Sequence, residues 1–264
     1  MSAEKFFKQI SLLRCPVCGT AFSRSQSALR CENGHTFDVA RKGYVHLLPN
    51  AKPSKYDAAL FEARRRIQES GFYDDVLCAI RKRIPADTAV LLDAGCGDGT
   101  FTKSLARGVT VGLDSAKDAI TLAARGGGPI LWTVGDLTRL PLADASVDVI
   151  LNLFAPAHYA EFRRVLKPGG RLIKLVPQAD YLAEIRALCA LPAYSNEAVV
   201  SHLAAQFCIV ERQRFTKTFA VTPEQAKDVL AMTPLTFDVG PDAADAQKIS
   251  SITIDVELLL AKAD

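Results

Sequence analysis

The sequence has no long uninterrupted run of hydrophobic residues. A membrane-spanning helix needs roughly 20 consecutive apolar residues, whereas charge interrupts the most apolar segments here, as at Asp148 in SVDVILNLF and Glu257 in IDVELLLA. The amino-terminal segment MSAEKFFKQISLLR mixes charges with short apolar pairs and lacks the pattern of a secretion signal. We therefore expect a cytoplasmic protein with no membrane partner.

The sequence also lacks the even set of cysteines that a disulfide framework requires. Of its 7 cysteines, three fall within residues 15–31 and the others are scattered. This distribution favours a local metal site in a reducing compartment. No internal repeat is present, and 264 residues, 49% of them hydrophobic, suffice for one large core and a smaller unit.

Positive charge is concentrated in the first third of the chain. Residues 1–90 contain 15 Lys and Arg against 9 Asp and Glu, whereas the remainder contains 17 against 20. Such an excess favours contact with a polyanionic partner. Clusters such as Arg64–Arg66 and Arg81–Arg83 are equally compatible with solvated helix faces.

Changes in composition divide the chain into three regions. Residues 1–48 are turn-rich and carry the clustered cysteines, and we interpret them as one small domain. Residues 49–87 begin with a Pro/Lys/Ser linker and continue as two helices joined by a turn at Ser70 and Gly71. Residues 88–264 form the third and largest region.

Strands and helices alternate from Ala89 onward, which predicts an α/β domain with a parallel sheet and helices on both faces. Two late segments, Cys208–Val221 and Ser250–Ala261, fit an antiparallel pair at the sheet edge with a helix at Pro223–Met232 between them. The other expected strands are Ala89–Asp93, Val109–Asp114, Ile130–Val134, Val147–Phe154 and Arg171–Val176, and the expected helices are Thr100–Arg107, Ala116–Arg125 and His158–Val165.

Four potential metal ligands are closely spaced in the first region. Cys15-Pro-Val-Cys18 is followed, after twelve residues, by Cys31-Glu-Asn-Gly-His35. Three thiolates and one imidazole brought to one point are a ligand set of tetrahedral Zn²⁺, and a glycine in each knuckle permits its tight turn. Because protein fills all four positions, the zinc site is expected to be structural. The alternative is two buried cysteines, a redox Cys-X-X-Cys pair and an unrelated histidine.

This first region is too small to build a sufficient core alone, so the metal would largely hold it folded. It is basic and has Phe22, Phe37, Tyr44 and His46 near the ligands, which favours contact with nucleic acid. A purely structural cap or a protein-docking module is the alternative.

A glycine-rich loop follows the first strand of the third region. Asp93 ends the strand, and Gly95, Gly97 and Gly99 alternate after it, which lets the backbone approach a ligand closely. No Lys-Ser/Thr pair follows, so the loop is not a phosphate-binding P-loop. Asp114 ends the second strand, where a carboxylate can accept both hydroxyls of a ribose. A dinucleotide site would share these features.

Two later features distinguish the alternatives. Gly135-Asp136-Leu137 ends the third strand, where a carboxylate can accept an adenine amino group and a backbone N–H can meet the ring. Pro141–Asp148 and Val165–Gly170 complete a pattern that resembles the class I AdoMet-dependent methyltransferases over about residues 88–176. The resemblance implies a class I, Rossmann-like methyltransferase domain behind the amino-terminal zinc-binding domain.

Nearly the whole chain resembles the RlmA family, which methylates N1 of a guanine in large-subunit ribosomal RNA. The segments that carry the resemblance are residues 31–45, Glu62-Ala-Arg-Arg, Ser70-Gly-Phe-Tyr73 and Met232-Thr-Pro-Leu, while residues 156–162 and 176–182 resemble the Gram-positive branch, whose members include macrolide-resistance enzymes.

The resemblance implies that the zinc-binding domain recognises RNA and that a homodimer holds a 23S rRNA hairpin in a basic cleft. Tyr73 matches a family position that covers the cofactor. The residues expected to bind AdoMet are Tyr73, Asp93, Gly95, Gly97, Asp98, Gly99, Asp114, Ser115, Asp136 and Leu137.

Two positions depart from the family pattern, which has Asn where His46 and His158 stand in this sequence. His158 follows the fourth strand, where class I enzymes place groups near the transferred methyl. Guanine N1 carries a proton near neutral pH, so a base or a donor to O6 must help expose its lone pair. We expect Asn152 to orient the base edge and His158 to take the proton. An Asp-mediated or water-mediated route is equally open.

Two other functions fit parts of the sequence. A small-molecule methyltransferase would share the cofactor motifs, but it has no need of a zinc-binding domain or of a basic amino-terminal third. A catalytically decayed RNA-binding protein would keep the zinc ligands, but intact Asp93, Asp114 and Asp136 argue against it.

Overall fold

The computed structural model describes residues 3–49, 56–237 and 245–263. The predicted linker therefore lies mostly outside the described residues. Two sheets are present in the described part of the chain, one of three strands and one of eight. None of the helices described is both long enough and apolar enough to cross a bilayer.

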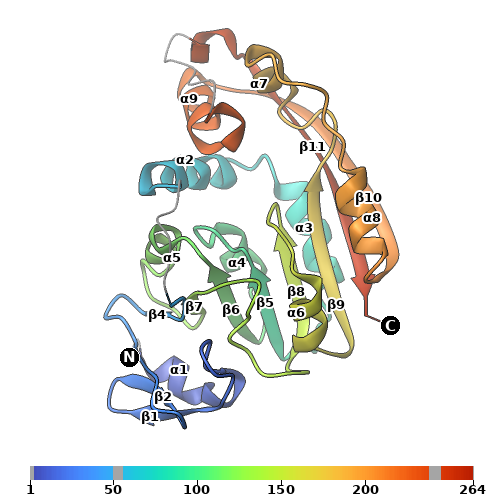
Figure 1. Cartoon of the computed structure of the whole chain (residues 1–264). Coiled ribbons are helices and arrows are strands. Elements are labelled where there is room, and N and C mark those ends of the chain that lie inside the picture. The colour runs from blue at the N-terminus through green and yellow to red at the C-terminus, as the bar shows by residue number, and fades with distance from the viewer. Residues whose placement is uncertain (1–2, 50–55, 238–244, 264) are drawn as a thin grey trace.

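The eight-stranded sheet has the order β10-β11-β9-β8-β5-β6-β7-β4 (Figure 1). The strands from β9 to β4 run parallel, and β10 and β11 add the antiparallel pair predicted for the edge. Its strands are β4 (Tyr44–His46), β5 (Val90–Ala94), β6 (Val109–Asp114), β7 (Leu131–Val134), β8 (Val147–Leu153), β9 (Leu166–Pro177), β10 (Cys208–Ala220) and β11 (Ser251–Lys262).

Helices cover one face of this sheet. Alternating side chains of β5 and β8, such as Leu91 and Val149, are buried against the helices that flank β5 in the chain. Phe101 and Ile80 fill the same cluster from the helical side. The helices that reach this face are α2 (Ala58–Glu69), α3 (Asp74–Arg83), α4 (Thr100–Leu105) and α5 (Lys117–Ala123), together with α7 (Ala183–Leu188) and α9 (Pro223–Met232) near the β10–β11 edge.

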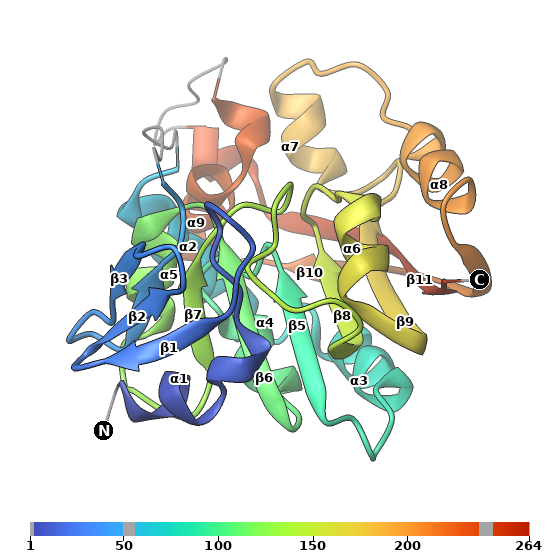
Figure 2. The same cartoon turned by 60° about the horizontal axis from the view of Figure 1, so that its bottom comes forward.

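The amino-terminal region covers part of the opposite face. Its three-stranded antiparallel sheet has the order β1-β2-β3, and Figure 2 shows it in front of the large sheet. Phe6, Leu13 and Leu29 are completely buried in one cluster with Leu92 and Val111 of the large sheet. The elements on this face are α1 (Glu4–Lys8), β1 (Phe22–Ser25), β2 (Ala28–Cys31), β3 (Thr36–Asp38), α6 (Tyr159–Val165) and α8 (Glu197–Ala204).

The amino-terminal region also contributes a strand to the large sheet. Tyr44, Val45 and His46 of β4 pair in parallel with Trp132, Thr133 and Val134 of β7. The boundary that the sequence places at residue 48 stays a prediction, but the structure joins the segments on its two sides through shared core and shared sheet.

Candidate zinc and cofactor sites

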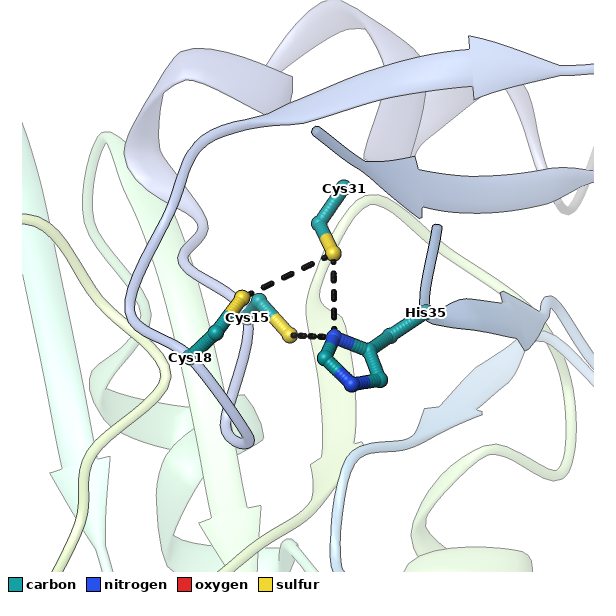
Figure 3. A group of neighbouring side chains, drawn as sticks. All are labelled: Cys15, Cys18, Cys31 and His35. Atoms are coloured by element: carbon teal, nitrogen blue, oxygen red, sulfur yellow. Dashed lines mark hydrogen bonds between the residues drawn. The ribbon is translucent and has the colours of Figure 1, made fainter. Parts of the chain in front are cut away.

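The four predicted zinc ligands lie together at one end of the small sheet (Figure 3). Their ligand atoms are all within 4.8 Å of one another. Cys18 Sγ is 3.7 Å from Cys31 Sγ, and His35 Nδ1 is 3.3 Å from Cys31 Sγ and 3.7 Å from Cys15 Sγ. In a tetrahedron with Zn–S bonds of about 2.3 Å, neighbouring ligands are about 3.8 Å apart. These separations therefore fit a zinc ion bound by all four residues.

Two tight turns of the same geometry, one at Cys15 and one at Cys31, orient the ligands. The Cys15 carbonyl accepts from the amide of Gly19 at 2.8 Å, and the Cys31 carbonyl accepts from the amide of Gly34 at 2.9 Å. Both glycines have φ near +80°, a left-handed conformation that other residues rarely adopt. The Thr20 hydroxyl and amide lower the pKa of Cys18 to about 5, so this ligand is a thiolate at neutral pH.

The glycine-rich loop lies at the carboxyl end of β5, as predicted. A Cβ atom at Gly95, where φ is +87°, would be 2.4 Å from the Cβ of Ala155, so only glycine fits against the segment after β8. A Cβ at Gly97 would meet only the ring of Phe61, at 3.8 Å. The loop is therefore tightly packed on one side and more open beside Gly97, toward α2.

Two buried carboxylates at this loop have unused oxygens. Asp93 and Asp98 are each 2% exposed. Asp93 Oδ2 accepts from the Thr102 hydroxyl at 2.6 Å, whereas Asp93 Oδ1 and Asp98 Oδ2 have no hydrogen-bond partner in the described part of the chain. Buried polar atoms are nearly always paired, so these oxygens indicate a ligand that donates to them.

The electrostatics of the loop indicate the charge of that ligand. Burial raises the pKa of Asp93 to about 7, and it also raises the pKa of Asp98 and of Asp114. Three crowded carboxylates favour a cationic ligand, because positive charge stabilises their ionised forms. AdoMet carries a sulfonium and an ammonium group, so the residues of this site fit it.

The other predicted cofactor residues lie at the carboxyl ends of neighbouring strands. Asp114 ends β6, and its carboxylate accepts from the amides of Gly97 at 2.9 Å and Ala116 at 2.8 Å. Ser115 is exposed beside it, and Asp136 and Leu137 follow β7 and are half-buried. The structure therefore brings the predicted cofactor residues of β5, β6 and β7 to one edge of the sheet. Their individual contacts with AdoMet stay a prediction.

Tyr73 lies in an aromatic cluster beside the glycine loop. Its ring is 5.3 Å from that of Phe101 and 5.9 Å from that of Phe154, and its hydroxyl is 2.8 Å from the hydroxyl of Tyr181. Phe154 has φ of +56°, a strained conformation of the kind that is retained at functional sites. Sequence reasoning missed Phe154 and Tyr181, because aromatic residues beside apolar strands resemble ordinary core.

Asn152 is completely buried at the end of β8, and each of its polar atoms has a partner. Its amide nitrogen donates to the carbonyls of Ala94 and Pro156, both at 2.9 Å, and its amide oxygen accepts from the Lys174 ammonium group. Its contacts are thus with the cofactor loop and with the segment after β8. The sequence did not identify Lys174, a buried cation whose pKa burial lowers to about 8.

The ring of His158 caps the start of α6. Its Nδ1 accepts from the amide of Glu161 at 3.4 Å. A neutral imidazole that accepts at Nδ1 carries its proton on Nε2, so this ring presents a donor at Nε2. A general base acting through Nε2 would need that nitrogen to be unprotonated, which this hydrogen bond at Nδ1 does not favour.

The sequence matches two family models. Residues 13–55 match the model described as RlmA, N-terminal, a zinc ribbon, and residues 92–174 match the model described as methyltransferase domain. The first contains the four zinc ligands and the second contains most of the cofactor residues.

Two relatives align along nearly their whole lengths. YxjB of Bacillus subtilis (strain 168), which is named for 23S rRNA (guanine-N1)-methyl transfer, is 36% identical over 95% of this chain and 96% of its own. The 23S rRNA (guanine(748)-N(1))-methyltransferase of Streptomyces fradiae is 33% identical over 96% of this chain and 97% of its own.

Among solved structures, YcgJ of Bacillus subtilis has a TM-score of 0.53 and 16% identity over 72% of this chain and 99% of its own. This likeness confirms the Rossmann-like fold alone. Together with the ribbon and methyltransferase models, it confirms the predicted fold class.

Proposed function

The chain belongs to the family of 23S rRNA (guanine-N1)-methyltransferases that carry an RlmA-type zinc ribbon, and we propose that it transfers a methyl group from AdoMet to N1 of a guanine in 23S rRNA. The observation that supports this proposal most directly is the likeness along nearly the whole chain, zinc ribbon included. A likeness confined to the methyltransferase domain would leave the acceptor open, because that domain serves many acceptors.

AdoMet supplies an activated methyl group, so this chain mainly has to hold the two reactants in line. Asp93, Asp98 and the amides of the glycine loop bind the donor at the carboxyl ends of β5 and β6. The target guanine enters above β8 and β9, where the rings of Phe154 and Tyr181 pack against each other with centroids 5.4 Å apart and offer an aromatic surface for stacking. A guanine within an RNA helix has to unstack to reach them.

We propose that His158 acts on guanine O6. Its Nε2 carries a proton while Nδ1 caps α6. Donation from Nε2 to O6 would draw electron density away from N1 and help its proton leave to solvent. This role fits the tautomer that the cap requires, whereas removal of the N1 proton by Nε2 does not.

We propose that Asn152 is a positioning residue. It joins Ala94 of the cofactor loop to Pro156 of the substrate-side segment, and Lys174 holds its amide oxygen in place. The buried Asn152 side chain thus links the loop that binds the cofactor to the segment on the substrate side. Because no amide donor of Asn152 is left over, orientation of the base edge falls to other groups.

The partner we propose is a 23S rRNA hairpin, bound by a homodimer in the cytoplasm where ribosomal RNA is modified. The supports are the family membership and the basic amino-terminal third of the chain.

Primer extension on 23S rRNA from a strain lacking the gene tests the proposal. Methylation at guanine N1 blocks base pairing and stops the polymerase, so one stop should vanish in the deletion strain and return on complementation. An Asp93→Asn copy should fail to restore it. An unchanged pattern of stops would remove the assignment.

A further inference from the structure

A basic cavity lies where the amino-terminal region meets the methyltransferase sheet. Its volume is about 560 Å³, and three separate segments line it: α1 with Lys5, the β3–β4 connection with Arg41 and Lys42, and the end of α5 with Arg125. Four cationic side chains reach the cavity, and no acidic residue of the described ranges lines it. The cavity is therefore suited to an anion.

Two of these cations are available to a ligand. The side chains of Arg41 and Lys42 are exposed, and neither makes a hydrogen bond or an ion pair with the residues that the structure describes. Arg125 is 3.1 Å from Glu62, but both side chains are about half exposed, so this pair is weak and exchangeable.

Lys5, unlike the other three cations, binds backbone carbonyls of the protein itself. Its Nζ donates to the carbonyl of Ile130 at 2.6 Å and to that of Gly128 at 3.2 Å. These bonds fasten α1 to the loop before β7, so the cavity wall is fixed on both sides. Burial at this contact lowers the pKa of Lys5 to about 8.

Three consecutive glycines also line the cavity. Gly126, Gly127 and Gly128 all have φ between +73° and +101°, and a Cβ added to any of them would meet no atom within 4 Å. A ligand oxygen can therefore approach the main chain closely. The same open space makes these positions suitable for introducing a test charge.

The cavity and the methyl-transfer site lie at opposite ends of the strands of the large sheet. The cavity lies beside the amino ends of β4 and β7, whereas Asp136 and the cofactor residues lie at the carboxyl ends of β5, β6 and β7. Four residues of β7 separate the two ends, about 13 Å at 3.3 Å per residue. One folded RNA can span that distance while a single base enters the methyl-transfer site.

We propose that this cavity binds backbone phosphates of the substrate RNA, with Arg41 and Lys42 as the principal contacts. The inference rests on the proposed function for the identity of the RNA. Phosphate contacts fix the position of the RNA and carry no sequence information, so the cavity contributes affinity and register, not choice of base.

Salt dependence of binding tests the proposal with the full-length protein and a hairpin from 23S rRNA. Each phosphate contact contributes about 0.7–0.9 to the slope of log K against log salt. Arg41→Gln with Lys42→Gln should therefore lower the slope by about 1.4–1.8, twice the value for one contact. The control pair Lys227→Gln with Lys262→Gln removes two exposed charges elsewhere and should leave the slope unchanged. An equal slope in wild type and the Arg41/Lys42 pair would overturn the proposal.

A charge introduced into the cavity gives a second test. Gly127→Asp and Gly127→Asn place side chains of the same shape at a position with open space, and Asp and Asn both tolerate left-handed φ. The Asp variant should bind the hairpin about tenfold more weakly than the Asn variant, the ratio that 1.4 kcal/mol of repulsion produces. Equal affinities would refute a phosphate at this place, and a difference seen with an acidic polypeptide and not with RNA would assign the cavity to a protein partner.

These outcomes are separable from failure of the proposed function. If wild type methylates no guanine of 23S rRNA, the proposed function fails. If wild type methylates normally and the cavity variants keep the wild-type salt slope, the cavity inference alone fails. Calorimetry with AdoMet should give the same affinity for all of these variants, because none touches the cofactor loop.

Discussion

Replacing one zinc ligand should destabilise the methyltransferase domain as well as the ribbon. Cys31→Ser removes a thiolate from a site whose four ligands are all supplied by the ribbon. Phe6 of α1 and the ribbon side chains Leu13 and Leu29 are completely buried in a cluster shared with Leu92 and Val111 of the large sheet. If the ribbon loses its metal and detaches, this part of the sheet is exposed to water.

The magnitude can be worked out from the buried side chains. Burial of a Leu or Phe side chain contributes about 1.5–3 kcal/mol, so these three alone contribute about 5–9 kcal/mol. The whole free energy of unfolding of a typical protein is about 5–15 kcal/mol. At about 2–4 °C per kcal/mol for a chain of this size, we expect the melting temperature to fall by at least about 10 °C.

Differential scanning calorimetry and AdoMet titration provide the assay. We expect Cys31→Ser to contain little zinc, to melt in one transition at the lower temperature, and to bind AdoMet weakly at 37 °C. Cys78→Ser is the matched control, because Cys78 is exposed on α3 and is not a ligand. The reasoning is refuted if Cys31→Ser keeps the main transition and the AdoMet affinity of wild type and loses only a small separate transition of the ribbon.

Substitutions at three further positions test the methyl-transfer site. Burial raises the pKa of Asp93 from 3.8 to about 7, so the folded protein holds a proton there that the unfolded chain has released. The contribution of Asp93 to stability should therefore fall as pH rises from about 4 to about 7, and a urea series on Asp93→Asn that keeps this slope would contradict the assignment. Asn152→Ala removes a partner from the Ala94 carbonyl and leaves the buried Lys174 ammonium with the Ala155 carbonyl, so it should cost about 1–3 kcal/mol in urea unfolding. Lys262→Ala, at an exposed position on the same sheet, should change stability by no more than about 0.5 kcal/mol. His158→Asn keeps both a cap acceptor and a donor and should retain most of kcat, while His158→Asp keeps only the acceptor and should lower kcat about tenfold or more; equal kcat values would exclude donation to O6.

Local periodicity explains why most of the sheet could be predicted from the sequence. Short apolar segments that end in Asp93 and Asp114 alternate with helix-forming segments, and the observed strands β5 and β6 agree with the predicted ones within one residue. The helix α9 was predicted with its observed bounds, and the structure shows a capping box of Thr222 and Gln225 at its start. The zinc ligands were predictable because their spacing along the chain is itself the signal.

Long-range packing explains what the sequence did not reveal. The strand β4 has only three residues, and its partner β7 lies almost ninety positions later, so no local pattern marks their pairing. Lys174 stands in an apolar strand, where a single Lys ordinarily faces solvent. Only the register of β8 against β9 places it beside Asn152. The tautomer of His158 likewise follows from a helix cap that appears only in the structure.

The packing of β5 links the zinc ribbon to the cofactor site more directly than overall stability does. Successive side chains of a strand point to opposite faces, so Leu92 and Ala94 face the ribbon while Asp93 faces Thr102 of α4. A ribbon loosened by a chelator should therefore let β5 shift and misplace the Asp93 carboxylate before the domain unfolds. Under mild chelation at 20 °C, we expect AdoMet affinity to fall in step with zinc content while helical circular dichroism is still that of the native protein. If hairpin affinity falls with zinc content and AdoMet affinity does not, the ribbon acts on the RNA alone and the coupling through β5 is wrong.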